Sequence, residues 1–143
     1  MRILSLDVGD KRIGIAISDE LELTARGIGV IERKGLKEDI KEILNILEQF
    51  DIGRVVIGLP RNMNGTLGPQ GESVKNFGEK LKSHANIDIV YWDERLTTIA
   101  AERTLLEADL SRKKRKGLID KMAAVLILQN YLDYKYKSHV DTK

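Results

Sequence analysis

The sequence predicts a mixed α/β fold, and three observations support that prediction. Two apolar, β-rich runs near the N-terminus, 3–8 and 13–17, flank a short Gly-Asp-Lys-Arg turn, which is the pattern of a β-hairpin. Further along, amphipathic helical segments alternate with short apolar runs, as in proteins that contain parallel strands. With 143 residues, 42% of them hydrophobic, and neither a repeat nor a linker, the chain is expected to form one domain over residues 1–143.

The elements after the hairpin are predicted from hydrophobic spacing. In order, we expect a strand over 22–32, a helix over 36–50, a strand over 54–59, a loop over 61–71, a second helix, a strand over 87–92, a third helix from Thr97 or Thr98 to about Leu110, a basic loop over 111–117 and a last helix over 118–136. Gly27 and Gly29 weaken the first of these strands and suggest an edge or a bulge. In the helix over 36–50, Asp39 is expected to face water. The result is an antiparallel meander followed by right-handed crossovers to parallel strands.

Composition excludes several kinds of site. The chain has no cysteine, which rules out disulfides, thiolate zinc sites and a cysteine nucleophile, and its two histidines are too few for a histidine metal centre. Any metal would therefore be a hard cation held by carboxylates and water. No apolar segment approaches the roughly 20 residues of a membrane span, so we expect a cytoplasmic protein without a membrane partner.

Charge is distributed unevenly along the chain. The formal net charge is only +2, yet residues 111–143 carry nine Lys and Arg against three Asp and Glu. A basic end on such a domain favours a polyanionic partner, although a solvated surface would produce the same excess.

Acidic residues stand at three places that this fold would bring together. Asp7 lies within the first apolar run, where a lone carboxylate is costly to bury. Asp93 and Glu94 follow the strand over 87–92, and Asp120 lies near the start of the last helix, ahead of two alanines that would allow a close approach to the sheet. Ligands in open α/β sheets sit outside the carboxyl ends of the parallel strands. Three carboxylates converging there suit Mg²⁺ or Mn²⁺.

Each acid also has a purely structural interpretation. Asp7 would serve equally well as a strand-end acid paired with Arg12 or Arg95, and Glu94 as a partner of Arg95. Acids in a first helical turn, such as Asp120, are routine.

Four ordered blocks of the sequence resemble the bacterial YqgF family of Holliday-junction-resolvase-like proteins, described as pre-16S rRNA nucleases. The blocks begin at Asp7-Val8-Gly9, Gly58-Leu59-Pro60, Asp93-Glu94-Arg95 and Asp120-Lys121-Met122, and they span essentially the whole chain. The resemblance implies a ribonuclease-H-like fold, with a mixed five-stranded sheet of order 3-2-1-4-5 flanked by helices.

The resemblance also implies a hydrolase, a metal-dependent endonuclease that trims the 5′ end of the small-subunit rRNA precursor. Asp7, Glu94 and Asp120 would be the catalytic and metal-binding triad for two Mg²⁺ or Mn²⁺ ions, with Asp93 as the alternative to Glu94. Basic residues near the site would hold the phosphates without reading sequence. These are Lys11, Arg12, Arg61, Arg95, Arg112, Lys113, Lys114, Arg115 and Lys116.

Three other functions remain open from the sequence. A resolvase acting on four-way DNA junctions would require a symmetric dimer, whereas we expect a monomer or a weak homodimer. A non-catalytic RNA-binding assembly factor would share the scaffold without turnover. An actin-like phosphotransferase also uses an Asp-x-Gly hairpin, but it needs a second hairpin of that kind and an adenosine site in a longer chain.

Overall fold

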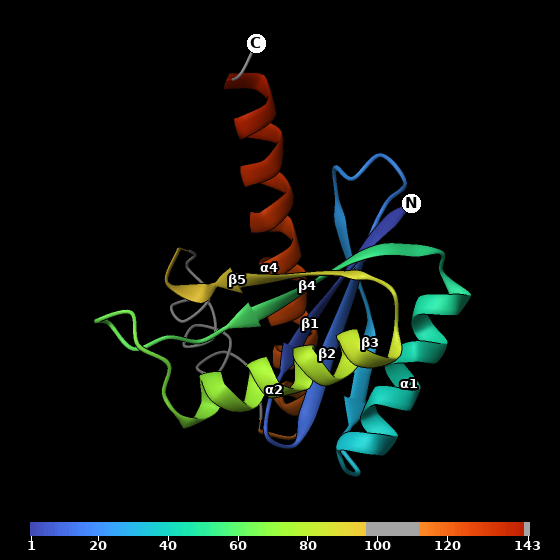
Figure 1. The fold of residues 1–143 in the computed structure, drawn as a ribbon, viewed down its shortest axis with the longest axis vertical. Helices are drawn as coiled ribbons and strands as arrows, with labels where there is room; N and C mark the ends of the chain where they lie inside the picture. The colour runs from blue at the N-terminus through green and yellow to red at the C-terminus, as the bar shows by residue number, and fades with distance from the viewer. Residues whose placement is uncertain (97–111, 142–143) are drawn as a thin grey trace.

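A mixed five-stranded sheet forms the centre of the computed structural model, which describes residues 1–96 and 112–141 (Figure 1). Its strand order is β3-β2-β1-β4-β5, which confirms the expected order. The strands β1 to β3 are antiparallel neighbours, and β4 and β5 join β1 in parallel. The strands are β1 (Arg2–Val8), β2 (Arg12–Ser18), β3 (Ala25–Glu32), β4 (Ile52–Leu59) and β5 (Asp88–Asp93).

Helices cover both faces of the sheet (Figure 1). Those described are α1 (Leu36–Gln49), α2 (Pro69–His84), the short 3₁₀ helix η1 (Glu94–Leu96) and α4 (Arg112–Asp141). The helices α1 and α2 pack on one face over an apolar core, and α4 packs on the other. No helix in the described ranges is both long and apolar enough to cross a bilayer.

Several predicted boundaries are wrong, among them the end of the last helix, which was expected at 136 and lies at Asp141. The basic segment from Arg112 to Gly117 is not a loop, because the backbone there already forms the first turns of α4. Lys and Arg have high helix propensity, so a run of charges is compatible with helix as well as with a solvated loop. The loop expected over 61–71 ends earlier, because α2 begins at Pro69, a residue well suited to the first turn of a helix. The helix predicted from Thr97 or Thr98 to Leu110 lies outside the described residues.

The weak third strand is present, but it begins at Ala25 rather than at residue 22. β3 is an edge strand, and its pairing with β2 shifts register between Ile15 and Ala16, opposite Gly29 and Gly27. A glycine-containing strand tolerates such a bulge because no side chain has to be accommodated.

Asp39 contradicts the prediction that it faces water. Its side chain is 1% exposed and forms an ion pair with Arg33 at 2.9 Å, while it also accepts a hydrogen bond from the backbone N–H of Lys34. Arg33 in turn donates to the carbonyl of Gly9 at 2.9 Å and lies over the ring of Phe77. A carboxylate is tolerated in this first turn of α1 because a cation and an N–H group compensate its burial. The pair connects α1 to the β1–β2 turn.

Successive residues of β1 point to opposite faces of the sheet. Leu4, Leu6 and Val8 belong to the core beneath α1 and α2. The alternate residue Ile3 belongs to the core beneath α4, and Ser5 donates a 2.7 Å hydrogen bond to the carbonyl of Ala124 in α4. By the same alternation, Asp7 faces α4.

Candidate nuclease site

The candidate site is built on a row of three residues across the sheet, Gly14–Asp7–Gly58. Asp7 pairs directly with Gly14 on β2, and Leu6 pairs with Ile57 on β4, which places Gly58 beside Asp7 in the next position of the register. Neighbours in register share a face of the sheet. Asp7 is 7% exposed, so its carboxylate lies in a largely enclosed position between two residues without side chains.

Gly14 brings Asp120 close to Asp7. A Cβ atom added at Gly14 would overlap the carbonyl oxygen of Asp120, so the backbone of α4 rests directly on the strand there. Ala123 and Ala124, 1% and 0% exposed, continue the close contact along the helix, as their small size predicted. The helix can approach the sheet to this extent only because a glycine occupies the row.

Gly58 makes room for Glu94. A Cβ atom added at Gly58 would lie 2.9 Å from Oε1 of Glu94 and would also meet the side chain of Ile127 in α4. The Glu94 carboxylate therefore reaches from η1 back over β4, on the face that carries Asp7. In this way the segments bearing Asp7, Glu94 and Asp120 meet around one row.

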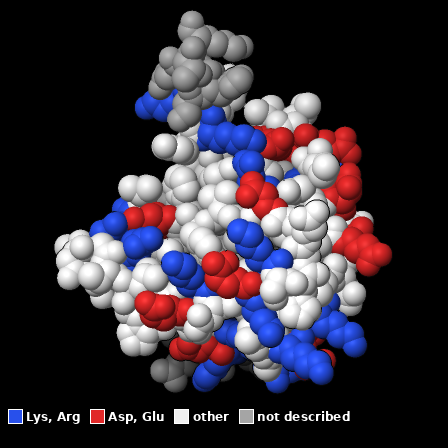
Figure 2. Space-filling view, in the orientation of Figure 1, with Lys and Arg blue, Asp and Glu red and all other residues white. Residues whose placement is uncertain are grey.

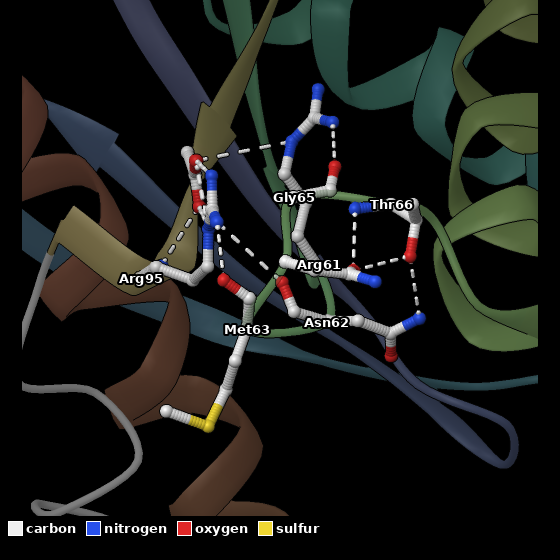
Figure 3. A network of polar contacts seen from close by, with 8 residues as sticks. Arg61, Asn62, Met63, Gly65, Thr66 and Arg95 are labelled. Carbon is white, nitrogen blue, oxygen red and sulfur yellow. Dashed lines mark hydrogen bonds and ion pairs between the residues drawn. The ribbon is translucent and has the colours of Figure 1, made fainter.

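Asp93 has a different environment. Its carboxylate accepts hydrogen bonds from Nε and Nη2 of Arg95, the latter at 2.7 Å, and Arg61 lies 3.8 Å away. The hydrogen bonds from the Arg95 side chain hold the pKa of Asp93 below its usual value, against the opposing effect of burial, and the charge of Arg61 adds to that lowering. Asp93 is thus occupied by two guanidinium groups (Figure 3). Of the two adjacent acids, Glu94 is the one beside the row.

The described cations expected to contact phosphate line the carboxyl edge of the parallel strands. Lys11 is exposed at the β1–β2 turn, where Arg12 pairs with Glu32 at 3.0 Å. Arg61 and Arg95 lie beyond the ends of β4 and β5 and share Asp93. The backbone of residues 112–116 forms the beginning of α4. By contrast, the face that carries α1 and α2 has Lys and Arg interspersed with Asp and Glu (Figure 2).

Whether the site fits a metal depends on both its donors and its arrangement. Three carboxylates without histidine or cysteine suit a hard divalent cation. The two glycines admit the backbone of α4 and the carboxylate of Glu94 at the positions beside Asp7 that side chains would otherwise fill. Within residues 1–96 and 112–141, however, no three acidic or histidine side chains form a ready metal-binding group. The donor chemistry fits a divalent cation, while the described part of the chain presents no ready-made group of three such ligands.

Several residues that shape the site were not predicted from the sequence. Gly14 and Gly58 admit α4 and Glu94, Ser5 bonds to α4, and Arg33 with Asp39 supports the turn after Asp7. The available signal was a glycine inside each of two strongly apolar strands, because an interior glycine often marks a close approach of backbone.

A solved structure with the same arrangement defines the class of fold. RuvC of Thermus thermophilus, solved with a Holliday junction substrate, is similar over 96% of both chains, with a TM-score of 0.60 and 14% identity. The Holliday junction resolvase of fowlpox virus is similar over 94% of this chain and 99% of its own, with a TM-score of 0.54 and 16% identity. The chain therefore has the ribonuclease-H-like fold of RuvC-type resolvases.

Sequence comparison shows the family. Residues 1–134 match the family model described as "RuvX: Holliday junction resolvase", and the chain belongs to this family, the YqgF family of the sequence resemblance. A protein of Clostridioides difficile (strain 630) named "Putative pre-16S rRNA nuclease" is 58% identical over 96% of this chain and 97% of its own. A relative of the same name from Clostridium tetani is 56% identical over 95% of this chain. Family and relatives together support a nuclease.

Proposed function

We propose that this protein is an endonuclease that hydrolyses phosphodiester bonds at the 5′ end of the precursor of 16S rRNA. The observation that carries the proposal is the meeting of three acid-bearing segments around the Gly14–Asp7–Gly58 row. The row lies at the carboxyl edge of β1 and β4, the edge where α/β sheets bind ligands. The substrate is taken from the names of the relatives that are 56–58% identical.

In this proposal, Asp7, Glu94 and Asp120 hold divalent cations, Mg²⁺ or Mn²⁺. A pair of such ions, when bound, activates a water molecule and stabilises the leaving oxygen. The preference for Glu94 over Asp93 follows from the two arginines that already occupy Asp93.

The basic residues position the substrate. Lys11, Arg12, Arg61 and the run 112–116 would contact phosphates along the edge, which orients a strand over Asp7 without selecting bases. Arg95 is a weaker candidate for phosphate contact, because its guanidinium is bonded to Asp93 and to loop carbonyls. We expect the protein to act in the cytoplasm as a monomer or weak homodimer.

The test is the Asp7→Asn variant, which keeps the size of the side chain and removes its charge. We expect Mg²⁺-dependent cleavage of precursor 16S rRNA to fall by about 10²-fold or more, because one charged ligand is removed. The matched control is Asp10→Asn, since Asp10 is an exposed acid at the turn that follows β1. Circular dichroism checks the fold of both variants. If Asp7→Asn folds and cuts as fast as the parent, the proposed site is wrong.

A second candidate function is resolution of four-way DNA junctions. The description of the matching family and the shared fold of T. thermophilus RuvC favour it. Paired symmetric nicks in a junction, with precursor rRNA left intact, would establish this alternative. Single cuts in precursor rRNA, with junction DNA untouched, would exclude it.

A further inference from the structure

The β4–α2 loop beside the site forms a tight turn that is held by hydrogen bonds among its own residues. Its backbone closes through two hydrogen bonds of 2.9 Å, from Asn62 N–H to the carbonyl of Thr66 and from Gly65 N–H to the carbonyl of Asn62. The side chain of Asn64 accepts from both the N–H and the hydroxyl of Thr66. Gly65 has a φ of 89°, a conformation that favours glycine. The turn therefore has one defined shape.

Arg95 fastens this turn to η1. Its Nη1 donates to the carbonyls of Met63 and Asn62, at 3.3 and 3.5 Å, while Nε and Nη2 bond to Asp93 (Figure 3). Arg61 adds a second connection, donating to the carbonyl of Gly65 at 2.9 Å and pairing with Asp93. Because Glu94 lies between the two residues of the Asp93–Arg95 pair, the position of the turn is linked to that of the candidate site.

Met63 projects from this fastened turn. Its side chain is 99% exposed and extends away from the polar network, although its own carbonyl is part of that network (Figure 3). On the η1 side of the same connection, Leu96 is 67% exposed. Single exposed apolar residues are common on protein surfaces. Met63 differs from such isolated residues, because a hydrogen-bonded turn fixes its backbone next to the proposed nuclease site.

The chemistry of methionine suits contact with bases. Its side chain is unbranched, and its polarizable thioether makes favourable contacts with aromatic rings. Proteins that unstack nucleic acids insert apolar side chains, methionine among them, between successive bases. A wedge must be held rigidly, since otherwise ordering it on binding would cost the free energy that it gains. The turn and Arg95 supply that rigidity.

We infer that Met63 is a wedge that inserts beside an unpaired base of the RNA, next to the phosphodiester bond that is cut at the candidate site, and so directs cutting to the boundary between duplex and single strand. The inference rests on the proposed function and adds a specificity-determining contact to it. Arg95 acts in it as a positioning residue, which holds the wedge at a set distance from Glu94.

The experiment compares Met63→Ala with the parent on an RNA hairpin that has a single-stranded 5′ extension and 2-aminopurine at the boundary. In Mg²⁺, single-turnover cleavage at increasing protein concentration gives the maximal rate and the half-saturating concentration. Stopped-flow fluorescence before cleavage reports unstacking of the 2-aminopurine. Leu21→Ala is the matched control, because Leu21 is 76% exposed and lies in the β2–β3 connection. Met63→Leu is the conservative variant.

For Met63→Ala we expect a half-saturating concentration about fivefold higher and loss of the fluorescence rise, with an unchanged unfolding temperature. We expect Met63→Leu to restore both signals and Leu21→Ala to match the parent. If Met63→Ala binds the RNA, unstacks the 2-aminopurine and cleaves like the parent, the wedge hypothesis is wrong, while the proposed nuclease function is unaffected. If its defect comes with a lower unfolding temperature, the wedge is also wrong, because Met63 then serves the folding of the loop. If the parent neither binds nor cuts the RNA, the proposed function fails and the wedge fails with it.

Discussion

The two faces of the sheet are built from the same strands but in different ways. Beneath α1 and α2, β1 presents Leu4, Leu6 and Val8 to a continuous apolar core. Beneath α4, the same strand presents Ser5 and Asp7 beyond Ile3, and its neighbours contribute Gly14 and Gly58. The first face is packed with side chains of the strands. On the second, toward the carboxyl edge, two glycines of the sheet admit the backbone of α4 and the carboxylate of Glu94.

The contrast separates stability from chemistry within one strand. Burial of aliphatic side chains supplies most of the favourable free energy of folding. The α4 face gives up part of that burial around Asp7, and a site of this kind needs polar groups held on a rigid element. Substitutions on β1 should therefore affect unfolding or cleavage according to the face on which they fall.

The largest expected effect on stability is that of Leu6→Ala. Leu6 is fully buried in the α1/α2 core, so the truncation should lower the free energy of unfolding by about 3–4 kcal/mol. Cleavage per folded molecule should not change. Ser5→Ala, on the opposite face of the same strand, removes one hydrogen bond to α4 and should cost about 1 kcal/mol. Urea denaturation of both variants measures the difference, and equal losses would contradict the division between the faces.

Gly14→Ala should have the next largest effect. Its new methyl group would overlap the backbone of Asp120, so α4 must move, at a cost of about 2–3 kcal/mol. Cleavage should fall as well, because Asp120 moves with the helix. Gly29→Ala on β3 is the control, since nothing lies within 4 Å of a Cβ atom there. Its stability should stay within about 0.5 kcal/mol of the parent. A Gly14→Ala variant as stable as Gly29→Ala would contradict the close contact of α4.

The smallest expected effect concerns Tyr91, which packs against the α1/α2 core. Burial raises the pKa of Tyr91 to about 12, and the charge of Glu79 and a hydrogen bond to it add to that shift. An unfolded tyrosine ionises near pH 10. Because the unfolded chain loses this proton first, the contribution of Tyr91 to stability is complete below about pH 10 and is lost as the pH rises towards about 12.

Tyr91→Phe should therefore flatten the fall of unfolding free energy between pH 10 and 12, measured by urea denaturation at several pH values. Tyr136→Phe is the control, because Tyr136 is 61% exposed on α4. If Tyr91→Phe and the parent lose stability in parallel over this range, Tyr91 is not buried as described.

Sequence patterns predicted most of the fold because they report local periodicity. The alternation of apolar runs gave the five strands and their neighbours α1 and α2. The same reasoning failed for Asp39, which helical spacing assigned to the solvent side and which an arginine from outside the helix compensates. It also failed for residues 112–117, where charge content does not distinguish a solvated loop from a solvated helix.

The candidate site divides in the same manner. Residue types and their order in the chain were enough to name three candidate acids and the edge of the sheet at which they would meet. Composition excludes cysteine and histidine as metal ligands, and the topology places the carboxyl ends of the parallel strands at one edge. The tertiary structure shows that, of the adjacent acids Asp93 and Glu94, Glu94 lies over Gly58 of the row, whereas Arg61 and Arg95 reach Asp93 from separate segments. It also explains why a glycine interrupts each of two apolar strands. Gly14 and Gly58 lack the side chains that would collide with α4 and with the Glu94 carboxylate. These contacts join parts of the chain that are far apart in sequence, so only the packed structure reveals them.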